Sequence, residues 1–513
     1  MSENQGQSQS QTQRMQMNNQ LKWVALVGLA LIVVLMINVN WIQGSQAKDL
    51  QNHALNTRKY QDAFLRVRGD IYSSDKVKLA YSEPLNPDSR KSKYQRKYLQ
   101  NGEVFVPITG FFAGTQQKGG LEIAFDSILD GRDDRQTANS WIRALAGEKP
   151  LGGNVYTTVD SKAQQVAYQR LTAQGPIRAA AVVIDAKTGA IKVAAGFPSF
   201  DPNSIAGVKD ASKAQQKLNE LAKDKDQPLV NKAYSELFPP GSSFKTVVAA
   251  AFLGRDGNSK DSLVPSPVQV ATGGKPIGNS HNDAICGVGQ APLIGTFAQS
   301  CNTTYALLGA DDQYLGNEAV RAQSEKFGFY KPVKIEDDLT APASQYPHNV
   351  QDRAEILRGS FGQGETKTTP LQMAMVAAAI ANDGNLMKPY LVEKATARVD
   401  DDGKPKEAGT IYNAEPTSLG KPISGGTAEQ IQEMMREVVR SGTAKNLQGR
   451  NIAGKTGTTE LTATRGGAWF VGFAPADKPK YAFAVFVEGS TSIFGASTAG
   501  PIAADIIDVL NRK

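Results

Sequence analysis

The segment Pro240-Gly241-Ser242-Ser243-Phe244-Lys245 indicates both the fold and the chemistry of this chain. An apolar run, Thr246 to Leu253, follows it and is typical of a buried helix. Ser242 and Lys245 are three residues apart and therefore share one face at the start of that helix. A serine hydroxyl becomes a nucleophile when a base takes its proton, and burial lowers the pKa of a lysine so that it can be that base. The segment thus predicts an activated serine.

The same spacing of serine and lysine occurs elsewhere, so by itself it identifies no site. Ser45 to Lys48 and Ser73 to Lys76 share it, but no apolar helix follows either of them. Two further motifs must therefore decide whether Ser242 is catalytic.

The first of these motifs is Gly454-Lys455-Thr456-Gly457-Thr458, which predicts an edge strand of a sheet. Such an edge pairs with an extended peptide, and Gly457 leaves room for the peptide backbone. The ammonium of Lys455 and the hydroxyls of Thr456 and Thr458 suit a terminal carboxylate. We therefore expect this strand to bind substrate.

The stretch Gly449 to Thr456 also fits the G-x-x-x-x-G-K-[ST] pattern of phosphate-binding loops. That loop follows a hydrophobic strand and opens a helix. Here a helical pattern, Ile431 to Arg440, precedes it, and residues 459–466 lead into another strand. We therefore expect no nucleotide site.

The second motif is Ser300-Cys301-Asn302, which opens a predicted helix from Thr303 to Leu308. Ser300 would pass a proton between Lys245 and a leaving amine, and the Asn302 amide would hydrogen-bond the substrate backbone. A lone Ser-x-Asn is more typical of a helix cap, so it counts only as part of the set.

From Val155 onward, predicted strands lie toward both ends of the chain and predicted helices lie between them. This order predicts a mixed sheet assembled from distant segments. The predicted elements are a helix at Ser161–Leu171 capped by Asp160, strands at Ala179–Asp185 and Ala190–Ala195, a helix at Leu371–Ala381, strands at Ala468–Ala474 and Tyr481–Glu488, and a helix at Ile502–Leu510.

In the order Ser-x-x-Lys, Ser-x-Asn, Lys-Thr-Gly, with gaps of 58 (300−242) and 155 (455−300) residues, the motifs resemble those of penicillin-recognising serine enzymes. Other stretches resemble class B penicillin-binding proteins: Arg68-Gly69-Asp70-Ile71, Val182–Gly196, Gly362-Gln363-Gly364 before Thr369–Gln372, and Trp469–Phe473. Tyr94–Tyr98 and Gly120-Leu121-Glu122 are similar to the penicillin-binding protein A type of actinobacteria.

The resemblance implies an α/β (α+β) fold of the penicillin-binding-protein and β-lactamase type, with an antiparallel sheet and an all-helical subdomain. It implies a peptidoglycan D,D-transpeptidase that β-lactams inhibit because they mimic D-Ala-D-Ala. Ser242 would be acylated by the stem peptide, Lys245 would be the base, and Ser300 would carry the proton to the leaving D-Ala. The implied substrate-binding residues are Asn302, Lys455, Thr456, Gly457 and Thr458. The N–H groups of Ser242 and Thr458 would form the oxyanion hole.

Four regions follow from the composition along the chain. Residues 1–20, rich in Gln, Asn and Ser, are predicted to be a disordered cytoplasmic tail. Residues 21–42 are apolar enough for a transmembrane anchor, and Arg14 and Lys22, on the leading side of its apolar run, place the catalytic part outside the plasma membrane. A signal peptide cleaved near Ser45-Gln46-Ala47 is the alternative, which the long polar leader disfavours. Residues 43–154 read as a small pedestal or dimerisation-type domain, and 155–513 as the transpeptidase domain.

Composition excludes several classes of function. The net charge is +7, but basic residues are not clustered with aromatic ones, so we expect no nucleic-acid partner. The three histidines, His53, His281 and His348, lack metal-ligand spacing, and we expect no metal and no cofactor. Cys286 and Cys301 are either two buried thiols or a disulfide.

Other enzymes share these three motifs, so their activities are alternatives to that of a transpeptidase. A class A β-lactamase needs a Glu-x-x-x-Asn motif, which does not occur in this sequence. A D,D-carboxypeptidase differs only in using water as acceptor, and the sequence does not separate it cleanly. The region between anchor and residue 155 is too short for a glycan-polymerising domain. The resemblance therefore implies as partners a separate polymerase of lipid-linked precursors and proteins of division or elongation.

Overall fold

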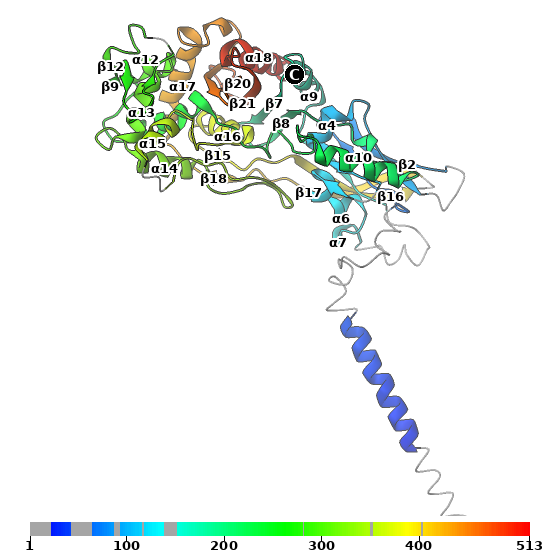
Figure 1. Cartoon of the computed structure of the whole chain (residues 1–513). Coiled ribbons are helices and arrows are strands. Elements are labelled where there is room, and N and C mark those ends of the chain that lie inside the picture. Colours follow the sequence, from blue (N-terminus) through cyan, green and yellow to red (C-terminus); the bar gives the residue numbers. More distant parts are fainter. Residues whose placement is uncertain are drawn as a thin grey trace, which may run out of the picture. The chain divides into compact units, whose positions relative to one another are not determined.

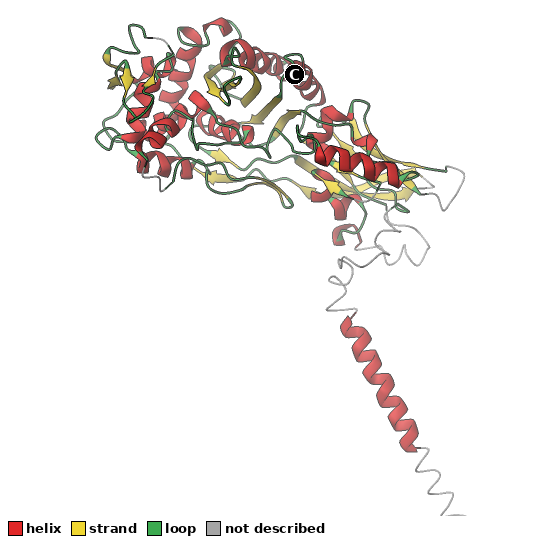
Figure 2. Cartoon of the chain, in the orientation of Figure 1, coloured by secondary structure: helices red, strands yellow, loops and turns green. Residues whose placement is uncertain are grey.

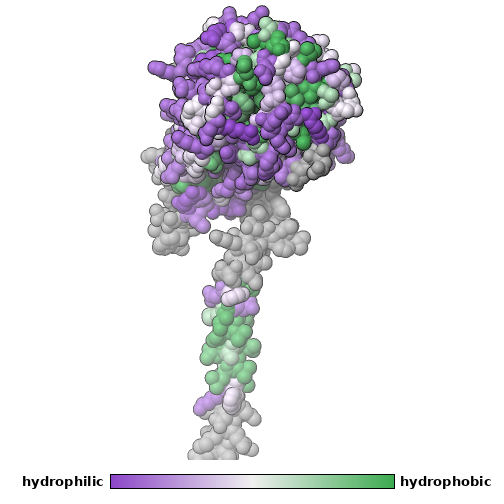
Figure 3. Space-filling model, turned by 90° about the vertical axis from the view of Figure 1, so that its left-hand side faces the viewer, coloured by the Kyte–Doolittle hydropathy of each residue, from purple (hydrophilic) through white to green (hydrophobic). Residues whose placement is uncertain are grey.

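The computed structural model describes residues 22–42, 64–86, 93–114, 117–137, 151–280, 282–348, 352–401 and 404–512. It divides into two units, residues 1–64 and 65–513, which we describe separately. In the first unit, residues Lys22–Ile42 form one exposed apolar helix of 21 residues (Figure 3). Its length matches the roughly 20 residues that span a bilayer. The predicted tail, residues 1–20, lies outside the described residues.

The second unit contains a five-stranded antiparallel sheet in the order β19-β20-β21-β7-β8 (Figure 1). Its strands are β7 (Arg178–Asp185), β8 (Ile191–Phe197), β19 (Ala453–Glu460), β20 (Arg465–Ala474) and β21 (Tyr481–Ser490). The sheet is built from distant segments, as predicted. All of its strand pairs are antiparallel, so the expectation of a mixed sheet is wrong here and the antiparallel sheet that the resemblance implies is confirmed. The first eight residues of β21 are all buried, because helices cover both faces of the sheet.

Figure 1 shows the helices that cover the sheet, α9 and α18 on one side and α16 on the other. Their bounds are Ser161–Thr172 for α9, Pro370–Ala381 for α16 and Gly500–Asn511 for α18. The predicted cap of α9 is confirmed, since Asp160 Oδ1 accepts a hydrogen bond of 2.9 Å from the N–H of Ala163. Helix α16 is buried along its whole length, as its apolar sequence predicts.

Most of the other helices between β8 and β19 form the helical subdomain. Its helices include α11 (Lys245–Leu253), α12 (Leu293–Ala298), α13 (Asn302–Ala310), α14 (Asn317–Lys326), α15 (Arg353–Gly359) and α17 (Gly425–Arg440). The sequence predicts that the stretch from Ser242 to Asp383 is largely helical, and α11 to α16 lie within it. The structure adds short strand pairs that the sequence did not indicate: β9 (Leu263–Ser266) with β12 (Gly289–Pro292), β10 (Gln269–Val270) with β11 (Ile277–Gly278), and β13 (Val333–Glu336) with β14 (Leu339–Ala341).

A second sheet has six strands in the order β17-β16-β6-β1-β2-β3 (Figure 2). Its strands are β1 (Ile71–Tyr72), β2 (Lys78–Pro84), β3 (Tyr94–Tyr98), β6 (Asn154–Thr157), β16 (Val392–Asp401) and β17 (Lys404–Asn413). Strands β1, β2, β3 and β6 precede Ser242 in the sequence, whereas β16 and β17 follow Asn302. The hairpin of β16 and β17 thus pairs with β6, more than 230 positions earlier, through partners such as Ala395 and Val155. The sheet therefore joins segments on both sides of residue 154.

Candidate active site

The candidate nucleophile Ser242 lies in a short 3₁₀ helix, η2 (Gly241–Phe244), that leads directly into α11. Ser242 is half-buried, and Lys245 is the first residue of α11 and fully buried. Two backbone contacts fix η2: the N–H of Gly241 donates to the Gly362 carbonyl at 2.8 Å, and Ser243 Oγ donates to the Pro240 carbonyl at 2.7 Å. The predicted placement of serine and lysine at a buried helix start is therefore confirmed.

Lys245 contacts both ends of the Ser300-Cys301-Asn302 motif. Its Nζ donates to the Ser300 carbonyl at 2.7 Å, to Ser300 Oγ at 3.2 Å and to Asn302 Oδ1 at 2.8 Å. All of these acceptors are uncharged. Burial, and then the charge of Lys455, hold the pKa of Lys245 well below its ordinary value. A lowered pKa favours the neutral form of the Lys245 amine, which can accept a proton.

Lys455 approaches the same serine from strand β19. Its Nζ donates to Ser300 Oγ at 2.9 Å and to the Thr456 carbonyl at 3.0 Å. Burial lowers the pKa of Lys455 to about 7. Ser300 Oγ therefore lies between two amines whose pKa values are both lowered, and a hydroxyl hydrogen-bonded to two amines can pass a proton between them.

Two aromatic rings lie beneath the two amines. Lys245 Nζ is 5.4 Å from the ring centre of Tyr305, and Lys455 Nζ is 5.5 Å from that of Phe297. The two rings meet edge to face, with their centres 6.4 Å apart. Cation–π attraction partly offsets the cost of burying a protonated amine, and it holds both lysines in place.

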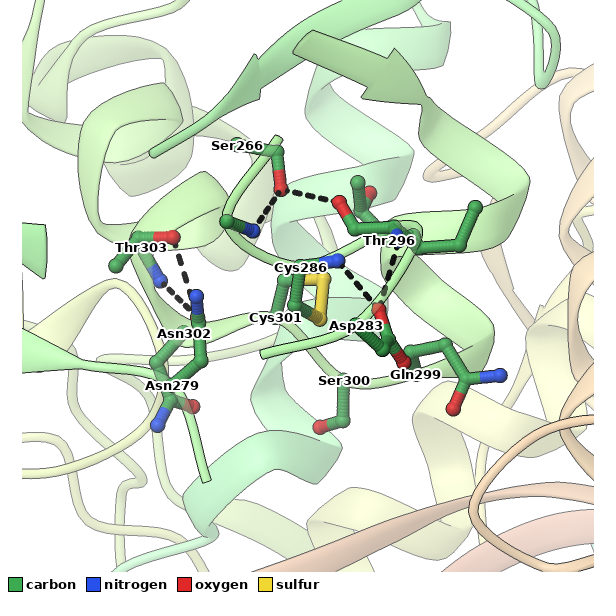
Figure 4. Close-up of a disulfide and its surroundings, with 12 residues drawn as sticks. Ser266, Asn279, Asp283, Cys286, Thr296, Gln299, Ser300, Cys301, Asn302 and Thr303 are labelled. Atoms are coloured by element: carbon green, nitrogen blue, oxygen red, sulfur yellow. Dashed lines mark hydrogen bonds between the residues drawn. A yellow bond between two sulfur atoms is a disulfide. The ribbon is translucent and has the colours of Figure 1, made fainter. Parts of the chain in front are cut away.

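A disulfide between Cys286 and Cys301 settles the question that the sequence left open (Figure 4). Their Cα atoms are 5.4 Å apart, and Cys301 is the middle residue of the serine–asparagine motif. Ser300, just before it, has a φ of +61°, which non-glycine residues adopt only when their surroundings hold them. The covalent link is one such constraint. Asn302 next to it donates from Nδ2 to the Gly278 carbonyl at 3.2 Å.

Strand β19 is an edge strand, as predicted, and its hydroxyls share one face. Side chains alternate along a strand, so Thr456 and Thr458 point to the same side; Thr456 is buried and Thr458 is exposed. A Cβ at Gly457 would lie 2.8 Å from the Pro240 carbonyl oxygen. The glycine therefore lets η2 approach the strand, and room for a substrate backbone there remains a prediction. The Gly-Lys-Thr of the phosphate-loop pattern lies inside this strand, where such a loop would begin a helix.

The structure adds one residue to the site that the sequence analysis missed. Thr443 Oγ1 lies 2.6 Å from Thr456 Oγ1, within hydrogen-bonding distance. The sequence carries no signal for this contact, because Thr443 belongs to none of the three motifs and reaches the strand only through the fold.

The comparisons with known proteins cover both parts of the larger unit. Residues 179–508 match the family model of the penicillin binding protein transpeptidase domain, and residues 68–155 match that of the penicillin binding protein A dimerisation domain. The chain is similar to the peptidoglycan D,D-transpeptidase PbpA of Mycolicibacterium smegmatis, with 33% identity over 96% of this chain and 97% of that protein. It is 32% identical to PbpA of Mycobacterium tuberculosis, over 96% of this chain and 99% of that one.

Solved structures agree with these relatives. The chain is similar to penicillin-binding protein A from M. tuberculosis as its penicillin G acyl-enzyme complex, with a TM-score of 0.77, 31% identity, and coverage of 87% of this chain and 99% of that chain. The imipenem acyl-enzyme complex of the same protein matches with a TM-score of 0.76 and 30% identity over the same shares.

Proposed function

The chain belongs to the class B penicillin-binding proteins, and from this premise we propose how its own residues carry out the peptidoglycan D,D-transpeptidase reaction of that family. Relatives that match it over nearly their whole length are peptidoglycan D,D-transpeptidases, and similar solved structures are β-lactam acyl-enzymes. The chain accordingly cross-links peptidoglycan stem peptides and is acylated by β-lactams. The observation that carries the residue assignment is the buried Lys245 amine, which is bonded to Ser300 and Asn302 and belongs to the residue three positions after Ser242 at the start of α11.

In the first half-reaction, Ser242 Oγ attacks the carbonyl carbon of the penultimate D-Ala. Neutral Lys245 keeps at most two of its three donated hydrogen bonds and takes the hydroxyl proton with its lone pair. The C–N bond to the terminal D-Ala breaks, and its amine leaves with a proton passed through Ser300. Ser300 Oγ suits this task because both Lys245 and Lys455 contact it. The product is an ester between Ser242 and the donor peptide.

In the second half-reaction, an amine from a neighbouring stem attacks the ester carbonyl and gives up a proton to the same relay. The new amide is the cross-link, and Ser242 recovers its proton. The N–H groups of Ser242 and Thr458 form the oxyanion hole in both steps. The close packing of η2 against β19 supports this, since a Cβ at Gly457 would lie 3.2 Å from the Ser243 nitrogen.

The donor peptide lies along strand β19 with its terminal carboxylate at the polar face. Lys455, Thr456 and Thr458 bind that carboxylate, by charge and by hydroxyl hydrogen bonds. Gly457 lies between the two threonines and keeps the strand free of a side chain there. Asn302 binds the donor amide, and its Nδ2 must first leave the Gly278 carbonyl.

The domain arrangement is part of the proposal. Residues 1–20 form a cytoplasmic tail and 21–42 a single-pass anchor in the plasma membrane, so that the catalytic part is extracytoplasmic. Residues 43–154 form a pedestal and 155–513 the transpeptidase domain. The pedestal is the natural contact surface for a glycan polymerase of lipid-linked precursors and for division or elongation proteins, because it lies between anchor and catalytic domain in sequence.

The experiment that tests the proposal is intact-mass spectrometry of the full chain in detergent after mixing with benzylpenicillin, followed over hours. A single long-lived penicilloyl adduct is expected, lost in Ser242→Ala and kept in the control Ser212→Ala, which replaces an exposed serine bonded to Asp210. No adduct on the wild type would overturn the serine mechanism. An adduct that clears within seconds would indicate a β-lactamase, and release of D-Ala with no cross-linked product would indicate a D,D-carboxypeptidase.

A further inference from the structure

The turn Ser441-Gly442-Thr443, which follows helix α17, contacts both the substrate-binding strand and Ala298, just before the Ser300-Cys301-Asn302 motif. The N–H of Thr443 donates to the Ala298 carbonyl at 3.1 Å, two residues before Ser300. The side chain of Thr443 meets Thr456 of the substrate-binding strand at 2.6 Å. A Cβ at Gly442 would lie 2.3 Å from the Ala298 oxygen, so glycine is required for this approach. We call these three residues the bridging turn.

The hydroxyl of Thr443 has a defined partner, and chemistry fixes the direction of the bond once substrate is present. A hydroxyl donates one hydrogen bond and accepts two. An ionised carboxylate only accepts, so Thr456 must donate its proton to the carboxylate that it binds. Thr456 Oγ1 can then act toward Thr443 only as an acceptor. Thr443 must therefore be the donor in their 2.6 Å contact.

We propose that Thr443 is a positioning residue, whose hydroxyl donates to Thr456 Oγ1 and thereby directs the Thr456 proton toward the terminal carboxylate of the donor peptide or of a β-lactam. This inference rests on the proposed function, because it assumes that β19 binds a carboxylate. Without the Thr443 donor, the Thr456 hydroxyl is free to turn toward the bridging turn, away from the substrate. Thr443 thus contributes to the preference for carboxylate-terminated substrates.

The structure separates this role from simple support of the fold. Thr443 is only half-buried, and its backbone contact with Ala298 persists whatever side chain it carries. Valine has the shape of threonine without the hydroxyl, and serine keeps the hydroxyl without the methyl group. The pair Thr443→Val and Thr443→Ser therefore isolates the hydrogen bond.

The test measures second-order acylation rate constants of the full chain in detergent with benzylpenicillin and with its methyl ester, which lacks the carboxylate charge. In Thr443→Val the rate with benzylpenicillin should fall about 3- to 10-fold, the range of one neutral hydrogen bond, while the ester rate stays constant. Thr443→Ser should restore the wild-type ratio of the two rates. Thr417→Val is the matched control: its hydroxyl is bonded to Glu415 on an exposed turn, and the ratio should not change.

Each outcome bears on one claim. An unchanged acid-to-ester ratio in Thr443→Val, or equal losses with both compounds, overturns the positioning role and leaves the proposed function intact. A wild type that acylates without preferring the acid overturns the carboxylate site itself, and a wild type that is not acylated overturns the proposed function. If Thr443→Val does not fold, Thr443→Ala removes the same hydroxyl with fewer atoms, and the same ratio decides.

Discussion

Two regions of the larger unit bury a pair of cations, and they do so in opposite ways. In the region that matches the dimerisation-domain model, Arg68 and Arg96 share the carboxylate of Glu122, each through an Nε–oxygen contact of 2.6 Å. In the catalytic region, Lys245 and Lys455 share the uncharged hydroxyl of Ser300. We call these the paired cluster and the unpaired cluster.

The difference appears in the titration of the groups. In the paired cluster, burial alone would raise the pKa of Glu122, but the charges of Arg96 and Arg68 hold it below its ordinary value. In the unpaired cluster, burial lowers the pKa of both lysines. A buried charge with a counter-ion is fixed in one state, whereas a buried amine without one sits close to gaining or losing its proton. The comparison teaches which buried cations are structural and which are reactive.

The sharpest test of the comparison replaces Lys245 by methionine. Acylation by benzylpenicillin should fall about 10³-fold because the general base is gone. The protein should remain as stable as the wild type or become more stable, because methionine removes the cost of burying an amine. Acylation kinetics and thermal unfolding measure the two effects.

Lys232 offers a matched control for that variant. It is as deeply buried as Lys245, but its Nζ is 2.7 Å from a carboxylate oxygen of Glu236. Lys232→Met should therefore lose stability and keep the acylation rate of the folded protein. If both variants lost the same property, the distinction between paired and unpaired amines would not hold.

The next largest effect is expected in the paired cluster. Glu122→Gln removes the carboxylate that Arg68 and Arg96 share, while Asp126 remains 2.7 Å from Arg68, and should cost about 3 kcal/mol in free energy of unfolding. Urea titration of the full chain measures this loss. The folded fraction should still acylate at the wild-type rate, since the cluster does not touch the active site. Glu220→Gln, on the exposed helix α10 (Ala211–Lys223), is the control and should change neither property. A loss of acylation rate in folded Glu122→Gln would contradict a purely structural role.

A covalent link holds the unpaired cluster where ion pairs do not. The Cys286→Ala/Cys301→Ala double variant opens a loop with a sequence separation of 15 residues, which should cost about 3 kcal/mol of stability. Urea titration of the double variant and of the wild type in dithiothreitol should give the same reduced value. Equal stability of the oxidised wild type and the double variant would show that the hydrogen bonds around Asn302 suffice to hold the segment.

The sequence predicted those features that depend on the spacing of residues within one short segment. The serine and lysine of the first motif lie at a helix start because the apolar run after them forces one, and β19 is an edge strand because its Lys-Thr-Gly order suits one. The sequence also isolated Arg68, Tyr94–Tyr98 and Glu122 as separate resemblances. It did not predict the contacts of Arg68 and Arg96 with Glu122, because these depend on how β3 and the short helix Leu121–Ala124 pack against Arg68.

Other features depend on contacts between distant segments and left no pattern to find. Thr443 reaches Thr456 only because the turn after α17 packs on Ala298. The hairpin of β16 and β17 adds two strands to the six-stranded sheet from a position far downstream in the sequence. The alternation of polar and apolar residues along the hairpin does not indicate that β6 is its partner. The two cysteines allowed either a disulfide or free thiols until the fold placed their Cα atoms 5.4 Å apart.

The smallest expected effect is the dependence of the acylation rate on pH. This dependence reports most directly the protonation of the two lysines of the unpaired cluster. Neutral Lys245 is the active form, so the second-order rate constant should rise with pH through a pKa that burial and Lys455 hold well below the ordinary lysine value. For Lys455 the charged form is the active one, because it binds the carboxylate of benzylpenicillin. Burial lowers the pKa of Lys455 to about 7. Above pH 7 the rate with benzylpenicillin should therefore fall about tenfold per pH unit. The methyl ester lacks the carboxylate that Lys455 binds and should keep its rate on the alkaline side. A profile for benzylpenicillin that is flat between pH 6 and 9 would mean that Lys455 keeps one protonation state throughout. The two lysines would then differ from the paired arginines in their partners but not in their reactivity.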